Sequence, residues 1–162
     1  LAEPFCPVLS NIVGDVAETL TLNERKIHRK GTYLCMEGPA FSTKAESELY
    51  RSWGCSIIGM TNHTEARLAK EAEIAYTSLA MSTDYDCWHE DHEAVTTEMI
   101  IENLLANVET AKQIVRSAIQ NLPLDRSSSP AYKALEKSIA TNPNVIPEET
   151  KQKLELLIGK YL

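Results

Sequence analysis

The chain has 162 residues, 43% of them hydrophobic and 24% charged, and its formal net charge is −7. These values are ordinary for one soluble globular domain with its own core. The lysines are scattered among glutamates, no apolar run is long enough to span a membrane, and no secretory signal is present, so we expect neither nucleic acid nor a membrane as partner.

The first part of the chain alternates helix and strand patterns. Apolar residues at helical spacing predict a helix over residues 7–22, and a β-rich run predicts a strand over 32–36. A Thr-x-x-Glu capping box predicts a helix over 43–53, which Gly54 ends.

The same alternation continues to the longest helix. A nearly continuous apolar run over 55–60 predicts a strand buried on both faces, and a capped helix over 62–72 follows. A second buried strand is predicted over 74–82, then a polar stretch over 83–93, then a long helix over 96–119.

This order of elements predicts an α/β fold, with a largely parallel or mixed sheet flanked by helices. We expect residues 1–120 to form the main domain portion. We expect residues 121–162 to form a helical tail, with short helices near 131–140 and 148–161.

Ligands of open α/β sheets bind at the carboxyl ends of strands, and the first such point is Gly59-Met60-Thr61. A helix N-terminus beside the Thr61 hydroxyl could hold an anion. The alternative is that Thr61 only caps the next helix.

The second strand end is Thr83-Asp84-Tyr85-Asp86, where Asp84 and Asp86 would face the same side of an extended chain. Paired carboxylates suit proton transfer near neutral pH, whereas the alternative is that they cap the following turn. The nearby residues Asp86, Cys87, His89 and His92 are metal-type ligands, but their spacing matches no zinc motif, and we expect no metal.

Other features are less specific. Phe41, after Gly38-Pro39, could stack on a flat ligand or pack as a staple on the next helix. The six glycines form no phosphate-cradling loop. The four widely spaced cysteines form no CxxC pair, which favours free thiols and a cytoplasmic protein.

Several segments in order resemble the purine nucleoside phosphorylase family. Residues 37–47 (EGPAFSTKAES) resemble its EGPxF(S/T)xxAES segment, and 59–72 resemble its MT…LAKEA segment. Residues 83–88 (TDYDCW) and 2–7 (AEPFCP) resemble the methylthioadenosine phosphorylase branch. The likeness covers residues 2–119 and corresponds to the C-terminal half of the family's domain.

The resemblance implies a reaction and roles for site residues. Phosphate attacks the ribose anomeric carbon and adenine leaves, giving 5-methylthioribose 1-phosphate; no cofactor is needed, and inorganic phosphate is the co-substrate. Asp84 would protonate or hydrogen-bond N7 of the base, and Asp86 would complete recognition of the 6-amino edge. By the same resemblance, Met60 would contact the sugar and Thr61 the phosphate. Phe41 would stack on the base, and Tyr85 would make backbone contacts.

The sequence also departs from the family. Gly59 stands where some members have an Asn near the base, and Asn62-His63-Thr64 replace residues that include a Pro. The family's N-terminal half, with its phosphate loop and Arg-His pair, has no counterpart here. We therefore expect a piece of a longer or processed protein, inactive alone, that needs the missing half and is a homotrimer when complete.

Three alternatives stay open on the sequence. The substrate could be methylthioadenosine or adenosine. Water could replace phosphate, although Thr61 at a helix N-terminus argues against this. The chain could also be a non-catalytic purine-binding or assembly module.

Overall fold

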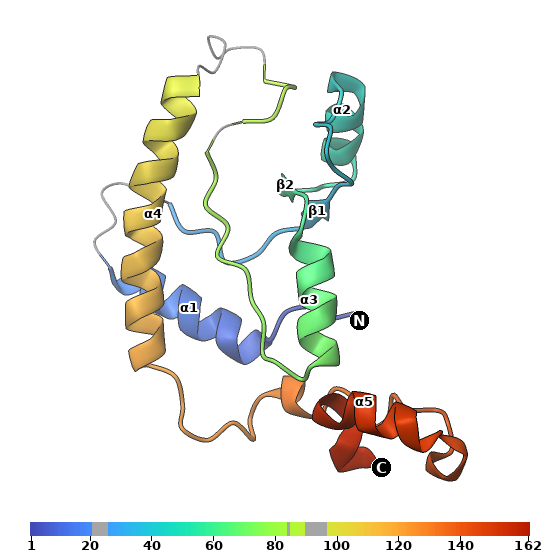
Figure 1. Cartoon of the computed structure of the whole chain (residues 1–162). Coiled ribbons are helices and arrows are strands. Elements are labelled where there is room, and N and C mark those ends of the chain that lie inside the picture. The colour runs from blue at the N-terminus through green and yellow to red at the C-terminus, as the bar shows by residue number, and fades with distance from the viewer. Residues whose placement is uncertain (21–25, 84, 90–96) are drawn as a thin grey trace. The chain divides into compact units, whose positions relative to one another are not determined.

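The computed structural model describes residues 1–20, 26–83, 85–89 and 97–162, and Figure 1 shows the chain trace. The α-helices are α1 (Pro7–Thr19), α2 (Lys44–Ser52), α3 (Asn62–Glu71), α4 (Thr97–Gln120) and α5 (Glu148–Ile158). Among the described residues, the strands are β1 (Tyr33–Cys35) and β2 (Ile57–Gly59), and the 3₁₀ helices are η1 (Pro130–Lys133), η2 (Pro143–Val145) and η3 (Gly159–Tyr161).

The chain divides into two compact units. Unit 1 contains Leu1–Ser10, His63–Thr77 and Pro123–Leu162, and unit 2 contains Asn11–Asn62 and Ser78–Leu122. Each unit is therefore built from segments far apart in the sequence.

The core of unit 2 joins α1 to α4. Val16, Ala17 and Ile114 form a buried cluster, which is surrounded by partly buried apolar side chains: Val13, Leu20, Ile27 and Leu79. Ile114 is only 1% exposed, so the contact is closely packed. The predicted amphipathic helices at both places are confirmed, ending at Thr19 and Gln120.

A parallel pair of strands forms the sheet of unit 2, as Figure 1 shows. The register pairs Tyr33 with Ile57 and Cys35 with Gly59. Both predicted strands are confirmed, but the prediction that residues 55–60 are buried on both faces is wrong, because Ile57–Gly59 are only half-buried. A sheet face becomes buried only when another layer of structure packs against it. The described residues cover this pair of strands only in part.

The predicted strand over 74–82 is wrong, because this described segment forms no strand. A strand is defined by a ladder of backbone bonds to a neighbour, which an apolar run alone does not supply. Here the Tyr76 carbonyl accepts from the Cys6 N–H at 2.7 Å, and two asparagine side chains bind the carbonyls at 82 and 83. The segment is extended, but its partners are a loop amide and side chains.

The tail after residue 121 is helical only in short pieces. α5 and η3 confirm the predicted helix over 148–161. The predicted helix over 131–140 is wrong beyond its first turn, where the 3₁₀ helix η1 gives way to turns. No helix that the structure describes is long and apolar enough to cross a membrane.

Candidate active site

The loop before α2 is ordered by the predicted capping box. Thr43 is the N-cap, and its hydroxyl accepts from the Glu46 N–H at 3.3 Å while the Glu46 carboxylate accepts from the Thr43 N–H at 2.7 Å. The Thr43 backbone N–H and then its hydroxyl lower the pKa of Glu46. This box fixes where α2 begins, and so which residues of α2 face the rest of unit 2.

Residues predicted for the sugar and base lie near this loop. A side chain on Gly38 would meet the Met60 Sδ at 3.2 Å, so the Met60 thioether packs against the loop that contains Gly38. The Phe41 ring is 87% exposed. Such exposure is incompatible with packing as a staple on α2, and it leaves the ring face open.

The end of β2 is shaped by an unexpected neighbour. A Cβ on Gly59 would lie 1.9 Å from the Tyr33 Oη, so the phenol lies where a side chain at 59 would be. The Tyr33 hydroxyl, from β1, therefore lies at the end of β2 beside Gly59. Thr61 is exposed and immediately precedes α3, which begins at Asn62 itself.

Asp86 is held by two donors in unit 2. The Ser47 hydroxyl donates a short hydrogen bond to Asp86 Oδ2, and the Cys87 N–H donates to Oδ1 at 2.9 Å. The Cys87 thiol points to the Ser42 carbonyl at 3.7 Å. The Asp86 carboxylate is therefore fixed against the helix that follows the EGPAF loop.

The side chains on either side of Asp86 form an aromatic cluster. Tyr85 lies 4.7 Å from His89 and 6.0 Å from Trp88 between ring centroids. The guanidinium carbon of Arg51 lies 3.4 Å above the Trp88 ring, close enough for a cation–π contact. The Tyr85 side chain is 58% exposed, so its ring packs at the surface of this cluster.

The segment before Asp84 is tied to α4. Asn107 donates to the Ser82 carbonyl at 2.9 Å, and Asn103 donates to the Thr83 carbonyl at 3.0 Å. Asn107 is 8% exposed, so its amide is committed to this contact. Residues 82–83 and 85–88 are thus anchored to different helices of unit 2.

Two predicted residues, Asp84 and His92, lie outside the described residues. Within the described ranges, no three His, Cys, Asp or Glu residues are grouped to hold a metal ion. Two of the metal-type residues considered in the sequence, Asp86 and Cys87, contact Ser47 and the Ser42 carbonyl as described above.

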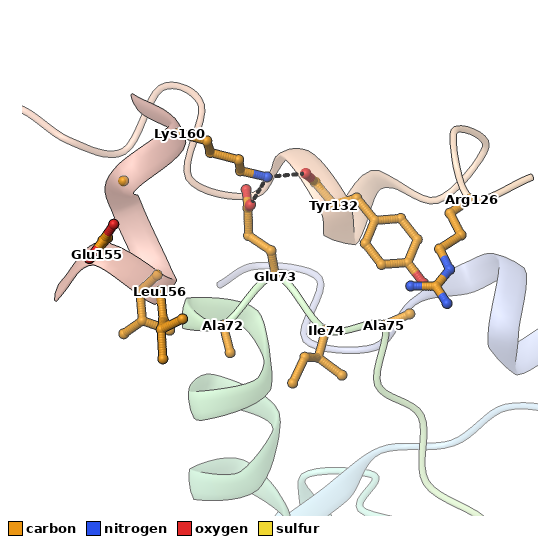
Figure 2. Close-up of a pocket in the computed structure, with 11 residues that line it drawn as sticks. Ala72, Glu73, Ile74, Ala75, Arg126, Tyr132, Glu155, Leu156 and Lys160 are labelled. Carbon is orange, nitrogen blue, oxygen red and sulfur yellow. Dashed lines mark hydrogen bonds and ion pairs between the residues drawn. The ribbon is translucent and has the colours of Figure 1, made fainter. Parts of the chain in front are cut away.

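A separate cavity of about 500 Å³ lies within unit 1, and Figure 2 shows its lining. Glu73 is buried at its edge; its carboxylate pairs with Lys160 and accepts from Tyr161 Oη at 2.6 Å and from the Leu135 N–H at 2.9 Å. Lys160 also donates to the Tyr132 carbonyl at 3.2 Å. This network fastens the tail to the residues after α3.

The charges of this network are mutually stabilised. Burial alone would raise the pKa of Glu73, but the bonds from Lys160, Tyr161 and the Leu135 N–H together lower it. The same carboxylate raises the pKa of Lys160 and of Tyr161. The cavity holds none of the residues predicted for the purine site, and sequence reasoning missed it.

The contributions of Ser47, Arg51 and Tyr33 to the candidate site were not predicted from the sequence. Ser47 ends the EGPAFSTKAES segment, and this position was the available signal. Arg51 and Tyr33 carry no comparable signal, because their contacts depend on tertiary packing across unit 2.

Comparison with known proteins identifies the family of this chain. Residues 1–120 match the model of the phosphorylase superfamily. The S-methyl-5′-thioadenosine phosphorylase of Prochlorococcus marinus is 52% identical over 161 residues, which are 99% of this chain and 51% of that protein.

Solved structures agree. A methylthioadenosine phosphorylase from an antarctic soil metagenomic library has a TM-score of 0.89 and 40% identity, covering 96% of this chain and 54% of that one. The methylthioadenosine phosphorylase of Schistosoma mansoni in complex with adenine has a TM-score of 0.68 and 30% identity, covering 77% and 48%. This chain thus spans about half the length of the relatives it matches. The family match over most of the chain, together with these relatives and with the anchored segments of unit 2, shows that the chain belongs to the phosphorylase superfamily.

Proposed function

We propose that this chain supplies the purine and ribose site for phosphorolysis of 5′-methylthioadenosine, or of a similar 6-aminopurine nucleoside. The products are adenine and 5-methylthioribose 1-phosphate. The observation that carries the proposal is the Asp86 carboxylate, held by Ser47 and the Cys87 N–H beside the segment that resembles the methylthioadenosine branch. The names of the relatives support the same reaction.

The base-recognition step follows from hydrogen-bond chemistry. An ionised carboxylate only accepts, so Asp86 suits the N–H groups of a 6-amino purine and not the oxygen of a 6-oxo purine. In the same proposal, Asp84 donates a proton or hydrogen bond to N7, which makes adenine a better leaving group. Tyr85 contributes backbone contacts between the two aspartates.

The sugar and phosphate roles follow the chain order of the site. Met60, packed against Gly38, lies under the ribose, and the exposed Phe41 ring stacks on the base. Thr61, at the start of α3, contributes a hydroxyl to inorganic phosphate, where free backbone N–H groups favour an anion. No organic cofactor takes part.

The rest of the proposal concerns the complete protein. The active form includes a counterpart of the half that the relatives contain and this chain does not span. We propose that this form assembles as a homotrimer in the cytoplasm. The four cysteines, all free thiols, agree with that compartment. The family model matches residues 1–120, and we propose that residues 121–162 form a helical tail beyond this portion.

The test is adenine release from methylthioadenosine by this chain, with and without phosphate. We expect no release by the chain alone, and phosphate-dependent release once the complementary half is added. Release without phosphate would favour hydrolysis instead. Adenine binding with no turnover in any combination would favour a non-catalytic purine-binding module.

A further inference from the structure

Ser47 is a buried hydroxyl in the middle of a helix. It is 1% exposed, and its N–H already donates to the Thr43 carbonyl at 3.0 Å within α2. A helical serine usually returns its hydroxyl proton to the carbonyl one turn back. Ser47 instead sends it across to Asp86 Oδ2, 39 residues later in the chain. Because an unsatisfied buried hydroxyl is costly, this contact is a fixed feature of the fold.

The two donors leave a defined part of Asp86 available. A carboxylate offers about four acceptor positions, and Ser47 and the Cys87 N–H each occupy one, on different oxygens. Both donors hold the group as an acceptor and set the plane in which its remaining lone pairs point. Ligand N–H groups, not carbonyl oxygens, match those positions.

α2 also contacts the residues that follow Asp86. Arg51, four residues after Ser47, lies on the same side of α2 and stacks on Trp88 at 3.4 Å. α2 therefore contacts the segment over residues 85–88 at two positions, Asp86 and Trp88. The Cys87 thiol against the Ser42 carbonyl adds a third point near the start of α2.

We propose that Ser47 is a positioning residue that fixes Asp86 as the acceptor for the exocyclic amine of the purine, and so sets the preference for 6-amino over 6-oxo bases. Arg51 assists by holding Trp88. This inference rests on the proposed function, since it assigns Asp86 to the base.

The experiment compares the full chain with Ser47→Ala, using adenine and hypoxanthine as probes in calorimetric titrations. Removal of one hydrogen bond to a charged group is expected to weaken adenine binding about tenfold. Hypoxanthine binding should change little, so the ratio of the two affinities falls. Ser52→Ala is the matched control, because Ser52 lies on the same helix and its exposed hydroxyl binds the Leu49 carbonyl.

A double-mutant cycle separates positioning from general damage. In the Asp86→Asn background, Ser47→Ala should have little further effect on adenine binding, since the residue it acts through is already changed. Additive losses in the cycle, or equal adenine binding by Ser47→Ala and the parent chain, would overturn the inference. Circular dichroism confirms that each variant is folded.

Hydrogen exchange at the Cys87 amide tests the inference without any ligand. Ser47→Ala should raise its exchange rate because Asp86 no longer holds a fixed place, and Ser52→Ala should not. If the parent chain binds no adenine even with the complementary half present, the proposed function fails, and this exchange rate alone decides whether Ser47 positions Asp86. Unchanged exchange at Cys87 would overturn the positioning.

Discussion

The Tyr33 side chain occupies the space that any side chain at position 59 would need. Because a Cβ on Gly59 would lie 1.9 Å from the Tyr33 Oη and 2.8 Å from its Cζ, Gly59→Ala must displace a rigid ring. We expect Gly59→Ala to lower the free energy of unfolding by about 1–3 kcal/mol, the usual cost of overpacking. Urea unfolding measures it.

The control for this pair is the double variant. Tyr33→Val shortens the side chain, so Gly59→Ala added to it should cost much less than it does in the parent chain. Equal costs in the two backgrounds would show that the Tyr33 ring is not what excludes a side chain at position 59.

Glu73 occupies a backbone position that usually belongs to glycine. Its φ is +53°, and the Ile74 N–H bonds the Ala69 carbonyl while the Glu73 N–H bonds the Lys70 carbonyl, the pattern that ends a helix with a left-handed residue. A glutamate in this conformation carries some backbone strain. The contacts of its carboxylate with Lys160, Tyr161 and the Leu135 N–H offset that strain.

Replacing that carboxylate should loosen the tail. Glu73→Gln keeps an acceptor but loses the charge, and we expect a loss of about 1–2 kcal/mol in the free energy of unfolding near neutral pH. Glu73→Gly would relax the backbone yet lose all three contacts. Glu149→Gln, which removes an exposed i,i+4 pair with Lys153, should cost no more than about 0.5 kcal/mol.

The same residue predicts a pH dependence. Because folding lowers the pKa of Glu73 below its ordinary value of 4.5, the folded chain releases this proton more readily than the unfolded chain. Its stabilisation is therefore complete above the unfolded pKa, and it is lost as pH falls through the lowered folded pKa. Thermal unfolding at pH values from about 7 down to 3.5 should show a steeper acid loss for the parent than for Glu73→Gln. Parallel curves would contradict this.

At the scale of elements, α2 depends on its first turn. Thr43→Ala removes the N-cap acceptor for the Glu46 N–H, which typically costs about 1 kcal/mol. Since α2 carries Ser47 and Arg51, fraying of its start should also speed exchange at the Cys87 amide. Urea unfolding and hydrogen exchange measure the two effects, and Ser52→Ala serves as control. A stable, unfrayed α2 in Thr43→Ala would refute the role of the cap.

The helix starts and the two paired strands could be predicted because their signals are local. The Thr43 capping box is a contact between residues three apart, and the structure confirms both of its bonds. The run over 74–82 misled the prediction because an apolar β-rich segment does not reveal its hydrogen-bond partner. Ser47, Tyr33 and Glu73 were missed for the same reason, since their roles depend on residues 39, 26 and 88 positions away.

At the scale of the whole molecule, α4 leaves one face open in the described structure. Residues at helical spacing on it are 39–64% exposed, although all are apolar: Ile101, Leu104, Leu105, Val108, Val115 and Ile119. Their spacing confines them to an arc of about 100° at 3.6 residues per turn. A face of this kind needs a covering layer, and the relatives are about twice as long as this chain. The complementary half is the occupant that we propose.

The last prediction tests that half directly. The part of the Prochlorococcus marinus relative that this chain does not span, mixed with this chain, should restore phosphate-dependent adenine release. Leu105→Asp should abolish the restored activity while leaving the chain folded, because Leu105 is already 64% exposed. Gln113→Asp adds the same charge to an exposed site on another face of α4, and it should leave the activity intact. Equal activity of the Leu105→Asp and Gln113→Asp mixtures would mean that the complementary half does not pack on this face.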